Sequence, residues 1–205
     1  MKKLTKIAAT LAALVLALAL AGCDNEEPTE GNGQADWSGF TMVDSVDKLD
    51  FKVGTYEMKE AASREHKFVG TATYAVKILS AESVTVTQKQ MVEQWHDEAD
   101  YAYEKEDWEE YCKEEGYTCA YNDSTHTITV TYLEKPRSQS LSDFKKNRFS
   151  PEEDPGKTTY SDIKLGSNKS GVIKASYSMN HIWKEVDGTV RTNITHITIT
   201  LTPQK

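Results

Sequence analysis

The sequence has few cysteines and no excess of basic residues. Three cysteines in 205 residues are too few for a disulfide-dense scaffold, and 32 Asp and Glu residues outnumber 24 Lys and Arg residues, which gives a formal net charge of -8. Nucleic acids and anionic lipid headgroups both bind to basic surfaces. We therefore expect no nucleic-acid partner and no attachment to a membrane through a basic patch.

The sequence also lacks the short motifs that specify common reactions. It contains no Gly-x-Ser-x-Gly, no phosphate-binding loop, no dinucleotide-binding fingerprint and no His-Glu-x-x-His. Catalytic triads assemble from residues that are distant in sequence, so this absence leaves catalysis open. We identify no catalytic residue, no metal ligand and no cofactor site, and a function other than catalysis is favoured.

A charged start and one apolar run precede the first cysteine. Lys2, Lys3 and Lys6 come before an apolar run from Ile7 to Leu20, about 14 residues long. A helix of that length spans roughly 21 Å, whereas the hydrocarbon core of a bilayer is roughly 30 Å thick. A charged segment, a short apolar segment and then small residues are typical of an export signal, and a permanent transmembrane helix is the weaker interpretation.

The four residues Leu20, Ala21, Gly22 and Cys23 resemble the lipobox of bacterial lipoprotein precursors. The resemblance implies that residues 1–22 are a signal peptide and that Cys23 carries a diacylglycerol, with palmitate among the acyl chains. It also implies a cell-envelope location, lipid-anchored to a bacterial membrane on the extracytoplasmic side. Asp24 resembles the inner-membrane retention signal of enteric bacteria, which has meaning only in such a host. The alternative is an ordinary secretory signal followed by a coincidental cysteine.

The stretch after Cys23 differs in composition from the rest of the chain. Residues 24–36 contain no large apolar side chain and are rich in Gly, Asn and acidic groups, so they cannot bury enough surface to offset the entropy of ordering. We interpret residues 23–36 as a lipidated flexible tether. Residues 37–205 are sufficient for one domain with its own core, and they show no internal repeat.

Cys112 and Cys119 are the remaining cysteines. Disulfides persist in exported proteins, so we predict a structural disulfide between the two residues. Closing so small a loop stabilises a fold by roughly 2–3 kcal/mol in the chain-entropy model. Free thiols are the alternative. A redox pair and a zinc site are weaker interpretations, because the spacing is not Cys-x-x-Cys and no histidine pair lies at zinc-finger spacing.

Alternating apolar and polar residues predict strands at several places. Residues 51–59 alternate weakly and predict an edge strand, whereas residues 67–79 alternate more clearly. In residues 126–133, Ile128 and Val130 share one face and threonines share the other, as expected for a half-buried strand. Residues 137–156 are polar and predict a loop with one helical turn near residues 141–149.

A broken helical segment is predicted from Gln88 to Glu115. Thr87 and Gln90 form a capping-box pattern at its start. The first apolar stripe consists of Met91, Val92, Trp95, Ala99 and Ala102. The second consists of Trp108, Tyr111 and Cys112, which point in another direction at 100° per residue. We therefore predict a break between Tyr103 and Asp107, and an end at Gly116.

A long hairpin is predicted at the C-terminal end. Asp187-Gly188 is a hairpin turn signal, and a three-residue loop at 187–189 sets a register in which Tyr177 pairs with Ile199. The apolar parity changes near Asn180, so we expect the hairpin to bend there. Together these patterns predict the α+β class: an antiparallel sheet with the broken helical segment packed on one face and a long C-terminal β-hairpin.

Two surfaces of the helical segment are candidates for binding. The possible binding surface consists of Trp95, Tyr101, Trp108 and Tyr111, because exposed aromatic residues mark surfaces that bind sugars or peptides. The alternative is that these rings pack the helices onto the sheet. Residues 93–115 contain eleven Asp or Glu residues and two Lys, which is typical of a solvated face and less often of a cation site or a docking surface for a basic partner.

These observations favour a membrane-anchored surface lipoprotein that binds an envelope protein, peptide or glycan without catalysis. A lipoprotein that binds a small molecule or a cation is the second hypothesis, and an envelope hydrolase is the third. Exposed Tyr or Trp residues would favour the first hypothesis, and a concave pocket with converging polar groups the second. A histidine that contacts a serine and is oriented by a carboxylate would favour the third.

Overall fold

The computed structural model describes residues 36–64, 68–152, 154, 157–184 and 188–205. The strands within this part of the chain are β1 (Phe40–Val43), β2 (Gly54–Arg64), β3 (Phe68–Ile78), β4 (Ser83–Trp95), β5 (Thr118–Asn122), β6 (Thr127–Thr131), β7 (Arg137–Ser140), β8 (Thr158–Asn168), β9 (Ile173–Lys184) and β10 (Val190–Pro203). The helices are the 3-10 helix η2 (Val46–Lys48) and the α-helices α2 (Glu98–Glu115) and α3 (Leu141–Phe149). The predicted signal peptide, the lipidation site Cys23 and nearly all of the predicted tether lie outside the described residues.

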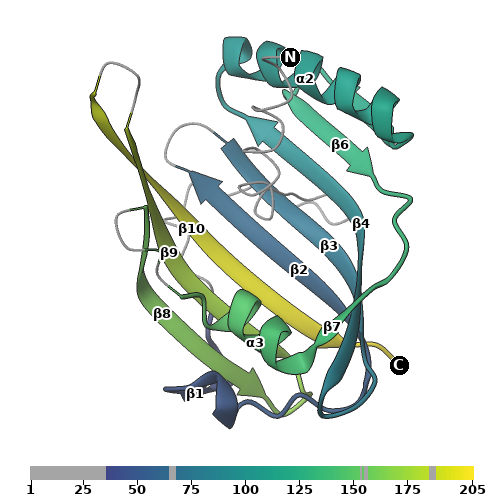
Figure 1. Ribbon diagram of the computed structural model, residues 1–205, viewed down its shortest axis with the longest axis vertical. Helices are drawn as coiled ribbons and strands as arrows, with labels where there is room; N and C mark the ends of the chain where they lie inside the picture. The colour runs from purple at the N-terminus through teal and green to yellow at the C-terminus, as the bar shows by residue number, and fades with distance from the viewer. Residues whose placement is uncertain (1–35, 65–67, 153, 155–156, 185–187) are drawn as a thin grey trace.

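All ten described strands belong to one antiparallel sheet (Figure 1). Its order is β1-β8-β9-β10-β2-β3-β4-β6-β5, and β7 pairs with the part of β4 that β6 does not cover. In Figure 1, α2 lies across one end of this sheet and α3 lies near the other. Neither of the two described α-helices combines the length and the apolar character that crossing a membrane requires.

The core is formed by alternate residues of the long strands. On β2, Tyr56, Met58 and Glu60 are buried while the residues between them are more exposed, as expected for a strand with one buried face. The other long strands contribute Val76, Ile78, Ile197, Ile199 and Leu201, all at most 1 % exposed. Phe144 and Phe149 of α3 are fully buried against this face. The apolar side chains of the sheet and α3 thus form one core.

The predicted α+β class is wrong, because strands dominate the domain. Of the described residues, 57 % are strand and 19 % are helix. The main cause lies in residues 83–95, which form β4 although their second half was predicted to be helical. A bulge leaves Lys89 without a partner on β3, between the pairs formed by Gln88 and Gln90. A bulge breaks the period of two, so the alternation of this strand is hidden in the sequence.

The predicted break within the helical segment is also wrong. α2 is continuous, and the side chain of Asp97 caps its start by accepting hydrogen bonds from the backbone N–H groups of Ala99 and Asp100. Its buried residues Tyr101, Trp108 and Cys112 lie on a single stripe. Two stripes were inferred because Trp95, which ends β4, was counted as part of the helix. The prediction that Gly116 ends the helix is confirmed, with φ of 72° in the left-handed region.

The predicted register of the C-terminal hairpin is two residues out. Tyr177 pairs with Ile197 instead of Ile199, and Lys184 pairs with Val190. Side chains alternate with a period of two, so a shift of two residues leaves each on its predicted face. The apolar residues of β9 and β10 therefore still meet one another. Asp187, on which the turn prediction rests, lies outside the described residues.

Other strand predictions divide between right and wrong. The strand predicted at residues 67–79 is confirmed as β3, and the strand predicted at 126–133 is confirmed as β6 with Ile128 and Val130 buried. The helical turn predicted near residues 141–149 is α3. The strand predicted at 51–59 is β2, but it lies between β10 and β3 and is not an edge strand.

Candidate functional site

Three of the four aromatic residues predicted as a binding surface are buried between α2 and the sheet. Trp95, Tyr101 and Trp108 are 9 %, 4 % and 5 % exposed. Tyr111 is half-buried and packs edge-on against Trp108, with the ring centroids 5.5 Å apart. The rings therefore attach α2 to the sheet, which is the packing alternative, and they leave little surface free for a ligand.

A buried carboxyl group, Glu93 of β4, lies within this aromatic cluster. Its side chain faces α2, and Glu93 is 4 % exposed. One carboxyl oxygen, Oε2, accepts hydrogen bonds from the indole N–H of Trp95 and of Trp108, each at 3.3 Å. Trp108 belongs to α2 and Trp95 to the sheet, so this carboxyl group joins the helix to the strand that it covers.

The surroundings of Glu93 favour its neutral form. Burial raises the pKa of Glu93 to about 7, and the nearby carboxylate of Glu104 contributes to the rise. The two indole donors and Arg64 act in the opposite direction, because they stabilise the ionised form. Glu93 therefore changes its charge near neutral pH, which an ordinary surface glutamate does not do.

A second buried carboxyl group forms an ion pair with α3. Glu60 of β2 is 2 % exposed, and both of its carboxyl oxygens accept hydrogen bonds from Nη1 of Arg148, at 2.7 and 2.8 Å. Burial raises the pKa of Glu60, and the guanidinium of Arg148 opposes that rise. The same pairing raises the pKa of Arg148 against the effect of its own burial. This pair fixes α3 to the centre of the sheet.

A serine and a histidine meet on the opposite, more exposed face of the sheet. Oγ of Ser178 on β9 lies 3.0 Å from Nδ1 of His196 on β10. Asp162 lies at a bulge in β8 and has φ of 55°. Its carboxyl oxygen Oδ2 accepts hydrogen bonds from Oγ of Ser178 at 3.5 Å and from Oγ of Ser161 at 3.0 Å. In a hydrolytic triad the carboxylate orients the histidine, whereas here it faces the serines. The geometry therefore does not support the hydrolase hypothesis.

The structure brings no metal-binding cluster together within the residues that it describes. No group of three or more His, Cys, Asp or Glu side chains there could hold a metal ion. His181 and His196 have opposite parity along the hairpin and pair with Asn193 and Ser178. The acidic side chains of α2 are mostly exposed to solvent, as on an ordinary solvated helix face.

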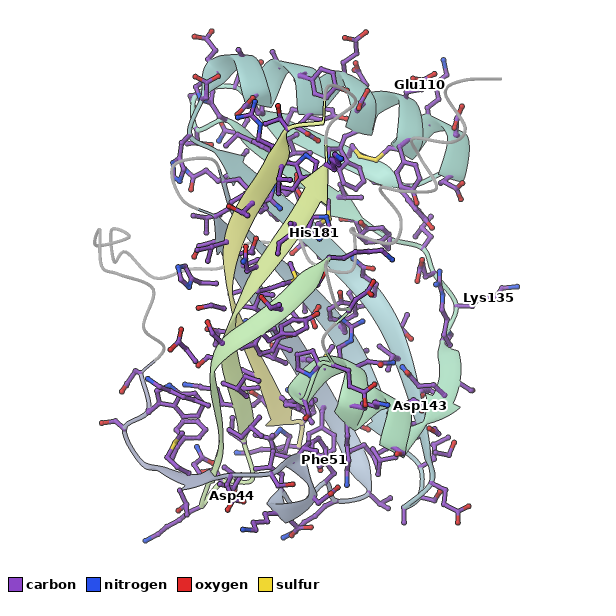
Figure 2. All side chains as sticks on the ribbon, turned by 60° about the vertical axis from the view of Figure 1, so that its left-hand side comes forward. Asp44, Phe51, Glu110, Lys135, Asp143 and His181 are labelled. Atoms are coloured by element: carbon purple, nitrogen blue, oxygen red, sulfur yellow. A yellow bond between two sulfur atoms is a disulfide. The ribbon has the colours of Figure 1, made fainter. Side chains whose placement is uncertain are left out.

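The two cysteines of the domain lie at disulfide distance. Cys112 is in the last turns of α2 and Cys119 is in β5, with their Cα atoms 6.3 Å apart, a separation within the range of disulfides. Figure 2 shows the sulfur–sulfur bond in yellow between α2 and the sheet. The left-handed turn at Gly116 returns the chain toward α2 and makes this approach possible.

The largest exposed aromatic and aliphatic side chains of the C-terminal hairpin lie at its tip. The pairing of β10 with β2 ends at Thr195, and the pairing of β9 with β8 ends at His181. Residues 182–184 and 190–194, which we call the arm, continue past these last described pairs, and residues 182–184 pair with 190–192. At its base, the backbone N–H of Ile182 donates to the carbonyl of Lys157 at 2.7 Å. Figure 1 shows the arm projecting from the sheet at the upper left.

The arm exposes apolar surface. Trp183 is 39 % exposed, Val190 is 63 % exposed and Ile194 is 47 % exposed. The ring of His181 stacks on that of Trp183, with the centroids 5.8 Å apart. Trp183 pairs with Arg191, whereas Val190 and Ile194 pair with Lys184 and Asn180, so the ring lies on one face of the arm and the two aliphatic side chains lie on the other. Apolar side chains exposed on both faces of a projecting element are typical of a surface that a partner encloses.

Glu60, Glu93 and Trp183 are not among the functional residues that the sequence patterns predicted. A signal for the two glutamates exists, because each stands between apolar residues at inward positions of a strand, as in Met58-x-Glu60-x-Ala62. Exposure of Trp183 has no such local signal, since it depends on where β2 and β8 stop pairing.

Comparison of the chain with protein-family models, with curated proteins and with solved structures gives no match. The functional conclusions therefore rest on the geometry of this chain.

Proposed function

We propose that this chain is a lipoprotein of the bacterial cell envelope that binds a protein or peptide partner through the arm. The lipobox resemblance at Leu20–Cys23 supports anchoring through a lipid on Cys23. The observation that carries the binding function is the arm itself, a hairpin end that projects past its neighbouring strands with Trp183, Val190 and Ile194 exposed.

The chemistry of the arm favours a protein or peptide over a glycan. Val190 and Ile194 are aliphatic and offer no hydrogen-bond partner to sugar hydroxyls, whereas apolar side chains of a protein can pack against them. Trp183 adds a large ring with one polar N–H, the kind of residue that is enriched at protein interfaces. Aromatic anchors of this type often account for most of the binding free energy.

The arm lies far from Asp36, the first described residue, as expected for a binding element on a protein that is anchored through its N-terminal segment. The described chain starts at Asp36, whose backbone carbonyl accepts a hydrogen bond from Nζ of Lys174 near the start of β9. The arm begins after residue 181 of the same strand, roughly 25 Å further along at about 3.3 Å per residue. In Figure 1, β1 lies at the bottom of the sheet and the arm at the top. A tether that leads to Asp36 would therefore leave the arm on the far side of the domain from its attachment.

Site-specific photocrosslinking in the native envelope tests this proposal. A photoreactive residue replaces Val190 in the full chain, so that Trp183 stays in place, and the matched control replaces Leu133 outside the arm; the two side chains are 63 % and 73 % exposed. We expect a discrete crosslinked partner band from position 190 and none from position 133. Crosslinks at neither position, or the same bands at both, would contradict binding through the arm.

A further inference from the structure

The contact between α2 and Glu93 is a buried polar contact beneath an acidic helix. Trp108 is 5 % exposed and donates its indole N–H to Glu93, which is 4 % exposed. Docking of α2 therefore encloses an ionisable group that water would reach if the helix moved away. Any process that frees α2 from the sheet also rehydrates Glu93.

The charged and titratable groups that face Glu93 come from three directions. From α2 comes Glu104, a carboxylate that disfavours the charge of Glu93, and from β2 comes Arg64, a cation that favours it. Tyr132, which follows β6, is the third titratable neighbour. Glu104 is itself half-buried, and burial raises its pKa, with a further rise from Asp107 and Asp100 on the same helix. Ionised Glu93 thus faces a helix that is already negative.

The other attachments of α2 are concentrated near β5 and its turn. The hydroxyl of Tyr101 and the ammonium of Lys105 both donate to Oδ1 of Asp123, each at 2.7 Å. Cys112 and Cys119 join the C-terminal part of the helix to β5. Loosening of the contact at Trp108 would therefore move α2 without releasing it.

We propose that α2 is a pH-sensitive clamp. Protonated Glu93 holds the helix most tightly on the sheet in mildly acidic medium, and ionised Glu93 loosens it as the pH rises to neutrality. The protonated carboxyl group is the more stable form at a buried site next to Glu104. The ionised group is more stable in water, so ionisation favours the arrangement in which α2 has moved away. The contacts with Asp123 and the disulfide-distance pair at Cys112 and Cys119 hold the helix on either side of Trp108, so the movement is confined to the middle of α2.

The direction follows from proton linkage. The pKa of Glu93 is about 7 with α2 docked, and its ordinary value of 4.5 applies when the group is hydrated. Between these values the open arrangement has lost its proton and the docked one retains it, so a rise in pH favours opening. The opening equilibrium can increase by up to about tenfold per pH unit in this window and becomes constant above it.

Hydrogen exchange of the full chain in mild detergent measures this opening. Amides of α2 are compared with amides of β9 in the same sample, so that the intrinsic effect of pH on exchange cancels. We expect protection of α2 relative to β9 to fall at least tenfold between about pH 5.5 and about pH 7.5. A ratio that stays constant across this range overturns the proposal.

Two variants assign the effect to Glu93. Glu93→Gln keeps the size of the side chain and a hydrogen-bond acceptor but removes the titration, so the ratio should no longer depend on pH. Glu104→Gln removes the neighbouring negative charge and so lowers the pKa of docked Glu93. The midpoint of the pH dependence should therefore move to lower pH, while the fold is kept. The matched control is Glu110→Gln, on the same helix, whose exposed side chain points away from the sheet (Figure 2), and it should behave as the original chain does.

The variants also define what would refute the mechanism. Glu93→Gln with an unchanged pH dependence would assign the loosening to another group. If Glu93→Gln unfolds α2 at every pH, Glu104→Gln decides, and an unshifted midpoint in that variant contradicts the role of Glu93.

Discussion

Arg148 of α3 and Glu60 of β2 are 88 positions apart in sequence, yet one guanidinium nitrogen of Arg148 donates to both carboxyl oxygens of Glu60, at 2.7 and 2.8 Å. The side chain of Glu60 is 3 % exposed and that of Arg148 is 16 % exposed. The guanidinium also lies over the ring of Tyr74, 5.1 Å from its centroid. Neither charge could be buried at this place without the other.

Removing one partner of this pair should destabilise the domain strongly. Arg148→Met leaves the carboxyl group of Glu60 buried without a counter-ion, which costs about 3–5 kcal/mol in comparable pairs. Urea unfolding followed by far-ultraviolet circular dichroism measures the loss. The double variant Glu60→Met with Arg148→Met should regain most of it, because a packed apolar pair avoids the desolvation of two charges.

An exposed ion pair provides the control for this experiment. Nζ of Lys48 lies 2.7 Å from Oδ1 of Asp44, and the two side chains are 61 % and 76 % exposed. Lys48→Met should cost less than about 1 kcal/mol, as is usual for ion pairs at the surface. Equal losses of stability for Lys48→Met and Arg148→Met would show that burial does not determine how much these pairs stabilise the fold.

The predicted disulfide should be intact in protein isolated from an oxidising compartment. Mass analysis without reductant should then find no free thiol at Cys112 or Cys119. Replacing both by Ala should lower the free energy of unfolding by about 2–3 kcal/mol, because the unfolded chain gains the freedom of an open loop. Two reactive thiols in the untreated native protein would contradict the bridge.

Truncation of Trp108 should destabilise the fold much more than truncation of Trp183. Trp108→Ala removes a buried ring and one donor to Glu93, so we expect a loss of about 3–5 kcal/mol in unfolding experiments. Trp183→Ala removes an exposed ring, and its effect on stability should be less than about 1 kcal/mol. The same Trp183→Ala change should weaken capture of the partner that crosslinks at the arm. A severe loss of stability from Trp183→Ala would mean that the ring supports the fold and is not free for binding.

Lipid attachment at Cys23 is testable without any structural information. Cells that express the full chain should incorporate labelled palmitate into it, and the protein should sediment with membranes. Cys23→Ala should abolish the label and move the protein away from the membrane fraction, because one residue supplies the whole attachment. Label that persists in Cys23→Ala would place the acyl chain on another residue or contradict lipidation.

Sequence patterns predicted the strands whose alternation is unbroken. β3 and β6 have a regular period of two, and Gly116 is one of the few residues that accept the left-handed conformation at a helix end. β4 was misinterpreted because the bulge at Lys89 moves its inward positions from Val84 and Val86 to Met91, Glu93 and Trp95. A change of parity within a strand cannot be distinguished from a helical stripe when the partner strand is unknown.

In the candidate site, too, local patterns identified residues but not their burial. Trp95, Tyr101 and Trp108 were recognised as a cluster from their density in the sequence, but their burial depends on the packing of α2 across the sheet. Glu93 could become a group that titrates near neutrality only when α2 covered it. Exposure of Trp183 likewise depends on the points at which β2 and β8 end.

The sequence by itself determined the properties that are local. These are the lipobox resemblance at Leu20–Cys23, the acidic stretch after it, the short interval between Cys112 and Cys119, and the faces of the regular strands. Only the tertiary structure decided which strands adjoin, which charges are buried and which apolar side chains remain in water. Those outcomes arise from contacts between residues such as Glu60 and Arg148, and the free energy of such contacts depends on distances that no local pattern encodes.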